Sequence, residues 1–271
     1  MVFELLSLFI FGLIIGSFLN VLVLRSETEE TLGGRSHCPR CQAMIHWYDN
    51  IPLLSFLFLR GRCRACQAPI SWQYPFVELG TGLSFTLMGA VFERGVATFE
   101  HLTILAALLF TTSLLIAIVV TDFRTMEIPL VFLWLSVLGA GAAMVLLPWL
   151  FHSAATPLWG ASSVHHLIGG LVAAIFFAVL VFGSRETWMG RGDIWLAATI
   201  GLLVGIKYLL LTLTLSFLLG AVIGVGLLFF GGKQLKSQIP FAPFLVFGFF
   251  LMTLLTWIQP WWLSFVLLPI E

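Results

Sequence analysis

Charged residues are scarce in this chain. Only 10% of its 271 residues are Asp, Glu, Lys or Arg, whereas 60% are hydrophobic and the mean hydropathy is +1.06. Soluble domains carry about 25% charged residues, so this composition excludes an ordinary soluble domain. The formal net charge is zero, which gives no electrostatic reason to expect a nucleic-acid partner. The composition predicts an all-α protein that crosses a membrane several times and contacts membrane lipid.

Long apolar runs occupy most of the chain and predict about eight transmembrane helices. Roughly 20 apolar residues are needed to cross the hydrocarbon core of a bilayer. The sixth run is short and is separated from the seventh only by Lys207, so seven is the alternative count. The expected spans cover residues 3–24, 76–93, 101–121, 128–149, 164–183, 194–206, 208–230 and 241–258.

The first apolar run lacks the marks of a cleavable signal peptide, which are a basic start and a small-residue cleavage site. It carries Glu4 near its start, so we expect it to stay as the first membrane helix.

With eight spans and the N-terminus outside, eleven of the thirteen Lys and Arg residues fall in cytoplasmic loops, and only Arg94 and Lys207 do not. Cytoplasmic loops are enriched in Lys and Arg, so this is the expected orientation.

One long polar segment separates the first apolar run from the others. It lies on the cytoplasmic side in the expected orientation and contains all four cysteines of the chain, as CPRC (38–41) and CRAC (63–66). We therefore expect three parts, which are a first transmembrane helix (1–24), a cytoplasmic segment (25–75) and a transmembrane domain (76–271).

The cysteine spacing is typical of a structural metal site. In the pattern C-x2-C-x21-C-x2-C, each pair forms a tight knuckle with two thiolates, and two knuckles complete a tetrahedron around one ion. Two disulfides are the alternative, which a reducing cytosol disfavours. His37 or His46 could also replace one ligand. The spacing predicts one zinc ion bound by Cys38, Cys41, Cys63 and Cys66.

Only three aspartates occur in the chain: Asp49, Asp122 and Asp193. Asp49 lies in WYDNIPLL, where a turn or cap role is expected. Asp122 follows the third expected span and Asp193 precedes the sixth, so both emerge at the cytoplasmic membrane face. Two carboxylates at one depth, far apart in the sequence, are what an aspartate dyad requires.

Each of these two aspartates also has a plainer explanation. Asp193 could cap its helix, and Asp122 could be an interfacial residue beside Arg124. Gly190 and Gly192 allow close backbone approach beside Asp193, and this favours the dyad. Two carboxylates within hydrogen-bonding reach share one proton. The ionised one can then activate water, and the protonated one can polarise a peptide carbonyl.

The stretch Gly190–Asp193 is a GxGD motif, which presenilin-like intramembrane aspartyl proteases share with bacterial prepilin peptidases. Other stretches decide between the two families, and together they cover most of the chain. The sequence resembles the bacterial prepilin peptidase (type IV leader peptidase) family in GSFLNV (16–21), IHWYDNIPLLSFLFLRGRCRAC (45–66), PISWQYPFVEL (69–79) and IPFAPFL (239–245).

This resemblance implies a function and a location. Members of the family cleave the short basic leader of type IV prepilins or type II secretion pseudopilins after a glycine, at the cytoplasmic face of the bacterial inner membrane. Bifunctional members then N-methylate the new N-terminus with S-adenosylmethionine. The resemblance implies that Asp122 and Asp193 are the catalytic pair and that the four cysteines bind zinc. The S-adenosylmethionine site is not located, because no Gly-rich loop follows a strand.

Three positions depart from the usual pattern of that family. Trp195 stands where a lysine often follows the GxGD aspartate, Leu130 where Asn or Asp often follows IP, and Ala242 where glycine is usual in IPFGP. None of these changes removes a carboxylate.

The rival hypothesis is an ion- or proton-coupled transporter that uses both aspartates. Such a transporter predicts inverted repeats and broken helices near the midplane, and the sequence indicates neither.

Overall fold

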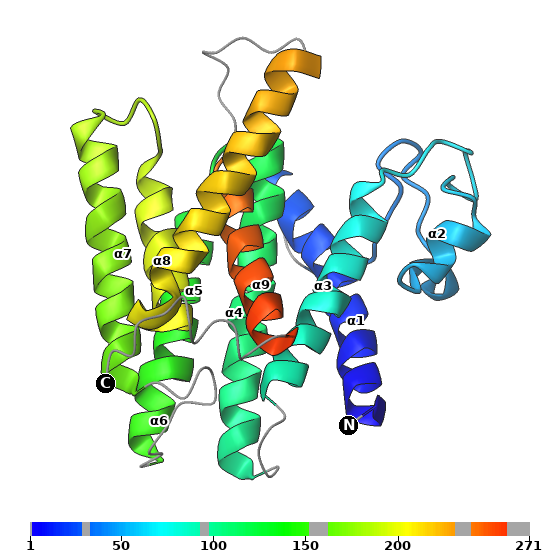
Figure 1. Ribbon diagram of the computed structural model, residues 1–271. Coiled ribbons are helices and arrows are strands. Elements are labelled where there is room, and N and C mark those ends of the chain that lie inside the picture. Colours follow the sequence, from blue (N-terminus) through cyan, green and yellow to red (C-terminus); the bar gives the residue numbers. More distant parts are fainter. Residues whose placement is uncertain (1, 29–32, 93–97, 152–161, 231–239, 259–271) are drawn as a thin grey trace. The chain divides into compact units, whose positions relative to one another are not determined.

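The computed structural model describes residues 2–28, 33–92, 98–151, 162–230 and 240–258. Within these ranges the chain is all helical, which confirms the expected fold class. The elements are α1 (Val2–Thr28), the 3₁₀ turn η1 (Trp47–Asn50), α2 (Leu54–Phe58), α3 (Gln73–Phe92), α4 (Phe99–Thr125), α5 (Leu130–Gly141), the π-helical η2 (Ala142–Leu146), α6 (Leu147–Leu150), α7 (Ser163–Gly183), α8 (Arg191–Phe230) and α9 (Ala242–Ile258) (Figure 1).

Six helical stretches in the described ranges are long and apolar enough to cross a membrane, and α9 is a shorter apolar helix. The expected spans 194–206 and 208–230 both fall within α8, which is broken at Gly205 (φ 69°, ψ 170°) rather than at Lys207. Figure 1 shows the change of direction at this break. The count of eight spans stays a prediction.

The chain forms two compact units, residues 1–89 and 90–271. In the first unit, glycines let α1 and α3 approach closely. A Cβ atom on Gly16 would lie 2.7 Å from the Cα of Glu78, and one on Gly12 would lie 2.7 Å from the Cα of Gly82. Asn20 is fully buried, and its side-chain amide donates to the carbonyl oxygens of Gly16 and Tyr74, both at 3.3 Å.

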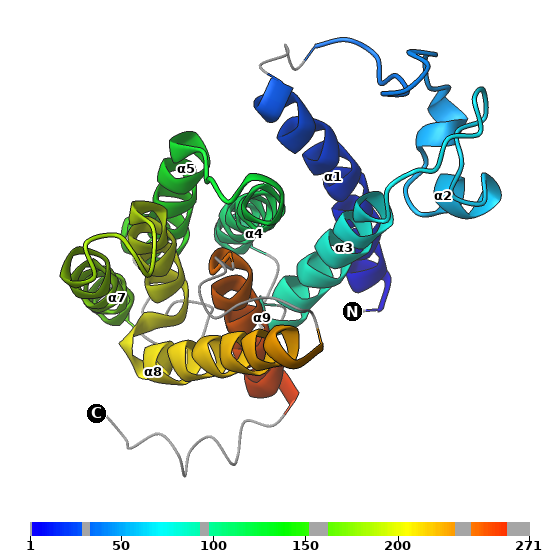
Figure 2. The ribbon, with the colours of Figure 1, turned by 90° about the horizontal axis from the view of Figure 1, so that it is seen from above.

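In the second unit, α7 packs along α8, and α9 packs against both α8 and α4 (Figure 2). A Cβ atom on Gly169 of α7 would lie 2.6 Å from the carbonyl oxygen of Gly201, so glycine permits this contact. The break at Gly205 is supported by His166, which is fully buried and whose Nδ1 lies 2.8 Å from the carbonyl oxygen of Leu202. The expected spans 194–206 and 208–230 predicted an interruption in this region, but at Lys207 and not at Gly205.

Candidate active site and metal centre

The two cysteine pairs fold as two copies of one knuckle. The amide of Cys38 donates to the carbonyl of Ala43 at 3.0 Å, and that of Cys63 donates to Ala68 at 2.8 Å. Isolated β-bridges close both loops, His37 with Met44 and Arg62 with Pro69. Both loops also share the sequence C-x2-C-Q-A, at residues 38–43 and 63–68. This short internal repeat is the signal from which the common fold could have been predicted.

The four sulfur atoms form one cluster. Each Sγ lies within 4.8 Å of the others, and the Sγ atoms of Cys38 and Cys66 are 3.9 Å apart. Four sulfurs around zinc at about 2.3 Å in a tetrahedron would be about 3.8 Å apart. All four residues are free thiols. The donor set therefore fits a tetrathiolate zinc site, as the spacing predicts, and His37 and His46 are not part of the cluster.

The protonation of these thiols is strongly perturbed. The backbone amide of Cys41 hydrogen-bonds to Cys38 and lowers its pKa to about 6, although burial acts in the opposite direction. The amide of Ala43 favours the Cys41 thiolate, but burial and the sulfurs of Cys66 and Cys38 outweigh it and raise the pKa of Cys41 to about 11. Negative charge on one sulfur opposes charge on the next, and a bound cation would relieve this repulsion.

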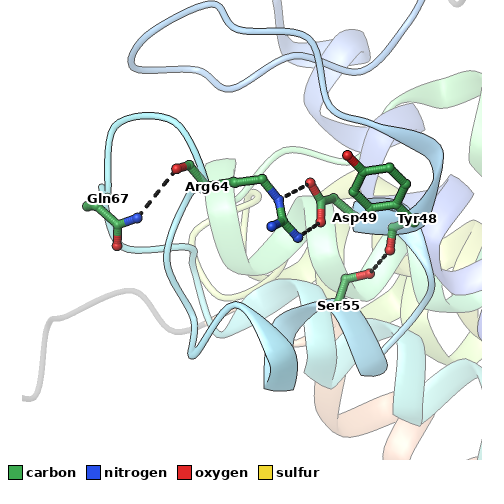
Figure 3. A network of polar contacts seen from close by, with 5 residues as sticks. All are labelled: Tyr48, Asp49, Ser55, Arg64 and Gln67. Carbon is green, nitrogen blue, oxygen red and sulfur yellow. Dashed lines mark hydrogen bonds and ion pairs between the residues drawn. The ribbon is translucent and has the colours of Figure 1, made fainter.

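Asp49 belongs to the fold of this segment rather than to the dyad. It lies in η1, and both of its carboxylate oxygens accept hydrogen bonds from the Arg64 guanidinium, at 2.6 Å and 2.8 Å (Figure 3). Hydrogen bonds from Arg64 hold the pKa of Asp49 below its usual value. Arg64 lies between Cys63 and Cys66, so this ion pair joins η1 to the second knuckle. The expected turn role of Asp49 is consistent with this position.

Asp122 lies in the last turn of α4 and is 6% exposed. Met126, in the left-handed conformation (φ 56°), ends the helix, and its amide donates to the backbone carbonyl of Asp122 at 3.0 Å. The Asp122 carboxylate accepts the backbone N–H of Ala242 at 3.1 Å. The IPFAPFL stretch thus brings the first residue of α9 to Asp122. The family pattern pointed to this stretch but not to its backbone amide.

Asp193 lies in the first turn of α8 and is 8% exposed. Its carboxylate accepts the backbone N–H of Gly190 at 3.1 Å, and its own N–H donates to the carbonyl of Gly190. Asp193 is the third residue of α8 and not its N-cap, and it satisfies the N–H of Gly190, the residue before the helix. Arg191 does not neutralise it, because the Arg191 guanidinium binds Glu186 at 2.7 Å.

The structure brings the surroundings of the two aspartates together. The end of α4 and the start of α8 lie toward the same end of the second unit (Figure 1). A Cβ atom on Gly192 would lie 3.5 Å from the side chains of Ile128 and Leu133. Neither carboxylate has a cationic partner among the residues described here.

The glycines of the GxGD motif have little of the protein packed against them. A Cβ atom on Gly192 would make ordinary contacts, and one on Gly190 would have only the amide nitrogen of Gly192 nearby, at 4.0 Å. Close packing within the described residues therefore does not require glycine at either position. Trp195 packs against Trp134 of α5 in a tilted arrangement, with ring centroids 4.3 Å apart. This aromatic pair occupies the position where the family often has a lysine.

The chain is similar to known proteins over most of its length. Residues 10–92 match the family described as bacterial peptidase A24 N-terminal domain, and residues 109–225, which include Asp122 and Asp193, match the type IV leader peptidase family. No solved structure matches the chain.

Curated relatives cover nearly the whole chain. A prepilin leader peptidase/N-methyltransferase of Aeromonas salmonicida (strain A449) is 35% identical, over 96% of this chain and 94% of its own length. A protein of the same name from Bacillus subtilis (strain 168) is 34% identical, over 89% of this chain and 90% of its own length. One from Myxococcus xanthus (strain DK1622) is 36% identical, over 83% of this chain and 64% of its own length.

Proposed function

Because the chain belongs to the type IV leader peptidase family, we propose that it cleaves the leader from type IV prepilins or type II secretion pseudopilins and N-methylates the new N-terminus. The observation that carries the peptidase assignment is the pair of buried aspartates, which lie in the matched region without a counter-ion among the described residues. The chain is a multi-pass membrane protein.

In the proposed reaction, Asp122 and Asp193 hold one proton between them. The ionised carboxylate takes a proton from water as the water oxygen attacks the carbonyl carbon of the scissile peptide. The protonated carboxyl polarises that carbonyl and then protonates the leaving nitrogen as the C–N bond breaks. The products are a leader with a free carboxylate and a mature protein with a free N-terminal amine. The amide of Ala242 orients Asp122, and that of Gly190 orients Asp193.

The amine formed by cleavage is the group that methylation consumes. S-adenosylmethionine would supply the methyl group when it is bound. In this proposal residues 25–75 form a segment held together by zinc on Cys38, Cys41, Cys63 and Cys66, and residues 76–271 form the peptidase domain. The zinc is structural, because four thiolates leave no open position for a water molecule.

The expected orientation places the aspartate pair at the cytoplasmic face of the inner membrane, and the distribution of Lys and Arg supports this. The rival transporter hypothesis gains one feature, since α8 is broken at Gly205. The relatives do not favour that hypothesis, however, because their names describe a peptidase and methyltransferase. The carbonyl of Leu202 near the break is also bonded to His166 instead of being left open for an ion.

The test of this proposal is to incubate the purified chain in lipid vesicles with a prepilin and S-adenosylmethionine. Mass spectrometry of the product N-terminus then reads both reactions. We expect loss of the leader and a gain of one methyl group. A prepilin that keeps its leader would contradict the peptidase assignment, whereas a cleaved but unmethylated product would contradict the methyltransferase alone.

The backbone hydrogen bond to Asp122 can be tested by itself. Ala242→Pro removes the N–H donor at the first position of α9, where the helix tolerates proline, but it also adds ring atoms at a fully buried position, so equal melting temperatures are required for the comparison. A hydrogen bond to a charged group contributes about 1.5–3 kcal/mol, so we expect the cleavage rate to fall about 10- to 100-fold. Ala242→Gly is the matched control, since it keeps the donor and restores the usual family residue. Equal rates for the two variants, with equal melting temperatures, would exclude a role for this amide.

A further inference from the structure

An apolar run lies between the two cysteine pairs. Residues 51–58, IPLLSFLF, belong to the segment expected in the cytoplasm. Three side chains of α2 at spacings of three and four residues are exposed: Leu54 at 50%, Leu57 at 69% and Phe58 at 82%. This spacing places them on one face of the helix. Exposed apolar side chains that gather on one face indicate contact with a partner or with lipid.

Contacts in the first unit determine the depth of this run beside the membrane helices. The amide of Leu53 donates to Oε2 of Glu78 at 2.8 Å. The backbone of Glu78 packs against Gly16, the neighbour of Ser17 in α1, where an added Cβ atom would lie 2.7 Å from the Cα of Glu78. Ser17 lies about 16 Å of helix rise before the end of α1 at Thr28. An upright α1 is about 40 Å long and the hydrocarbon core is about 30 Å thick, so at most about 10 Å of the helix extends beyond the core on this side. The level of Ser17, about 16 Å from the end of the helix, therefore falls inside the core. Leu53 is therefore level with the hydrocarbon.

A groove along α1 gives independent evidence for the same depth. Residues 50–52 line this groove, which has a volume of about 590 Å³, and Ile14 and Val21 of α1 line it too. Both α1 residues lie well before the end of that helix at Thr28. The start of the apolar run thus lies along the side of α1 and not beyond its end.

The backbone of the run meets the main requirement for entering lipid. Non-helical backbone at membrane depth must have its polar groups satisfied by the protein. The amide of Leu53 has Glu78 as its acceptor, that of Ser55 donates to Ile51 at 3.0 Å, and that of Leu57 donates to Leu53 at 3.1 Å. The hydroxyl of Ser55 donates to the carbonyl of Tyr48 (Figure 3). Side chains facing outward from the run are apolar.

The residues that flank the run are those found where a protein meets the lipid head groups. Trp47 precedes it and is 78% exposed, and Trp72, the residue before α3, is 66% exposed. Arg60 and Arg62 follow it and are both exposed. Tryptophan is enriched at the membrane–water interface, and arginine side chains extend toward anionic head groups.

We propose that residues 51–58 enter the membrane leaflet on the side of the zinc knuckles, with Leu54, Leu57 and Phe58 against acyl chains. Glu78 is the positioning residue, since its carboxylate holds the amide of Leu53, which has a left-handed backbone (φ 60°). The apolar run thereby ties the cysteine segment to the bilayer. This inference concerns the attachment of the segment and does not depend on the proposed enzymatic reactions.

The test uses the full chain in lipid vesicles. A keto amino acid carrying a nitroxide replaces Phe58, so that the four cysteines stay intact, and a matched label replaces Arg40, an exposed residue of the first knuckle. Power-saturation EPR compares collisions with oxygen, which concentrates in lipid, and with a water-soluble nickel chelate. We expect the ratio of oxygen to nickel collisions to be several-fold higher at 58. A ratio at 58 equal to that at 40 would overturn the proposal, and so would protection of 58 from both reagents, which would indicate burial against protein.

The role of Glu78 is tested with the same label at position 58. Glu78→Leu removes the acceptor of the Leu53 amide, and Glu78→Gln keeps an oxygen in its place. We expect increased nickel accessibility at position 58 in the leucine variant and little change in the glutamine variant. An unchanged label depth in Glu78→Leu would overturn the positioning role.

Discussion

Asp122→Asn and Asp193→Asn are each expected to abolish leader cleavage while the protein still inserts into the membrane. Each asparagine keeps an oxygen that can accept the N–H of Ala242 or Gly190, so the local fold is retained. What is lost is the exchange of one proton between two acids. Removing one member of a catalytic unit lowers the rate by about 10⁴-fold or more, and we expect a loss of this size. The measurement is the initial cleavage rate on one prepilin in one lipid.

Non-additivity separates this expectation from two independent structural roles. If the aspartates act as one unit, the double variant Asp122→Asn/Asp193→Asn should be no slower than either single variant. The matched control is Asp49→Asn, which changes the third aspartate of the chain, the one bound to Arg64. It should cleave at nearly the wild-type rate. Substantial cleavage by either single variant would disprove the dyad.

The fold class and the metal cluster could be predicted from sequence because their signals are local or compositional. Long apolar runs are enough to predict membrane helices, and the spacing within each C-x2-C pair determines a knuckle. The cluster of Cys38 with Cys66 follows once two knuckles share one ion. The surroundings of Asp122 and Asp193 were also expected to meet, because membrane topology restricts each aspartate to one depth.

Contacts between a side chain and a distant backbone amide could not be predicted in this way. The bond from Leu53 to Glu78 spans 25 positions and that from Ala242 to Asp122 spans 120. Backbone amides are present at every residue and leave no pattern in the sequence. Such bonds placed part of the expected cytoplasmic segment beside α1, where composition alone predicted only a polar connection.

The break in α8 was misplaced for a related reason. Lys207 is a conspicuous charge in an apolar run, so the helix was expected to end there. The structure instead breaks the helix at Gly205, whose positive φ is a conformation that favours glycine. The buried His166 from α7 supports this turn through the carbonyl of Leu202. The interaction comes from another helix, and hydropathy along α8 carries no information about it.

Cys38→Ser and Cys63→Ser are expected to lose the zinc ion, which should be present at about one per chain in the unchanged protein. Elemental analysis of the purified protein measures this directly. His37→Ala and His46→Ala are the matched controls, since neither histidine belongs to the sulfur cluster. They should keep the metal. Absence of zinc from the unchanged protein, with its cysteines in disulfides, would refute the site.

The consequence of zinc loss should be unfolding of the cysteine segment, because metal-binding free energy serves as folding free energy when a segment is too small to form a core. We expect proteolysis within residues 25–75 to increase, and methylation and substrate capture to suffer at least as much as peptide hydrolysis.

Acid should also cause loss of the zinc ion. Thiolates bind the metal and thiols do not. The pKa of Cys38 is lowered from its ordinary value of 9.0 to about 6, so the stability contributed by its thiolate is complete above the ordinary value and is lost as the pH falls through the lowered one. Zinc retention measured against pH should therefore decline on the acid side.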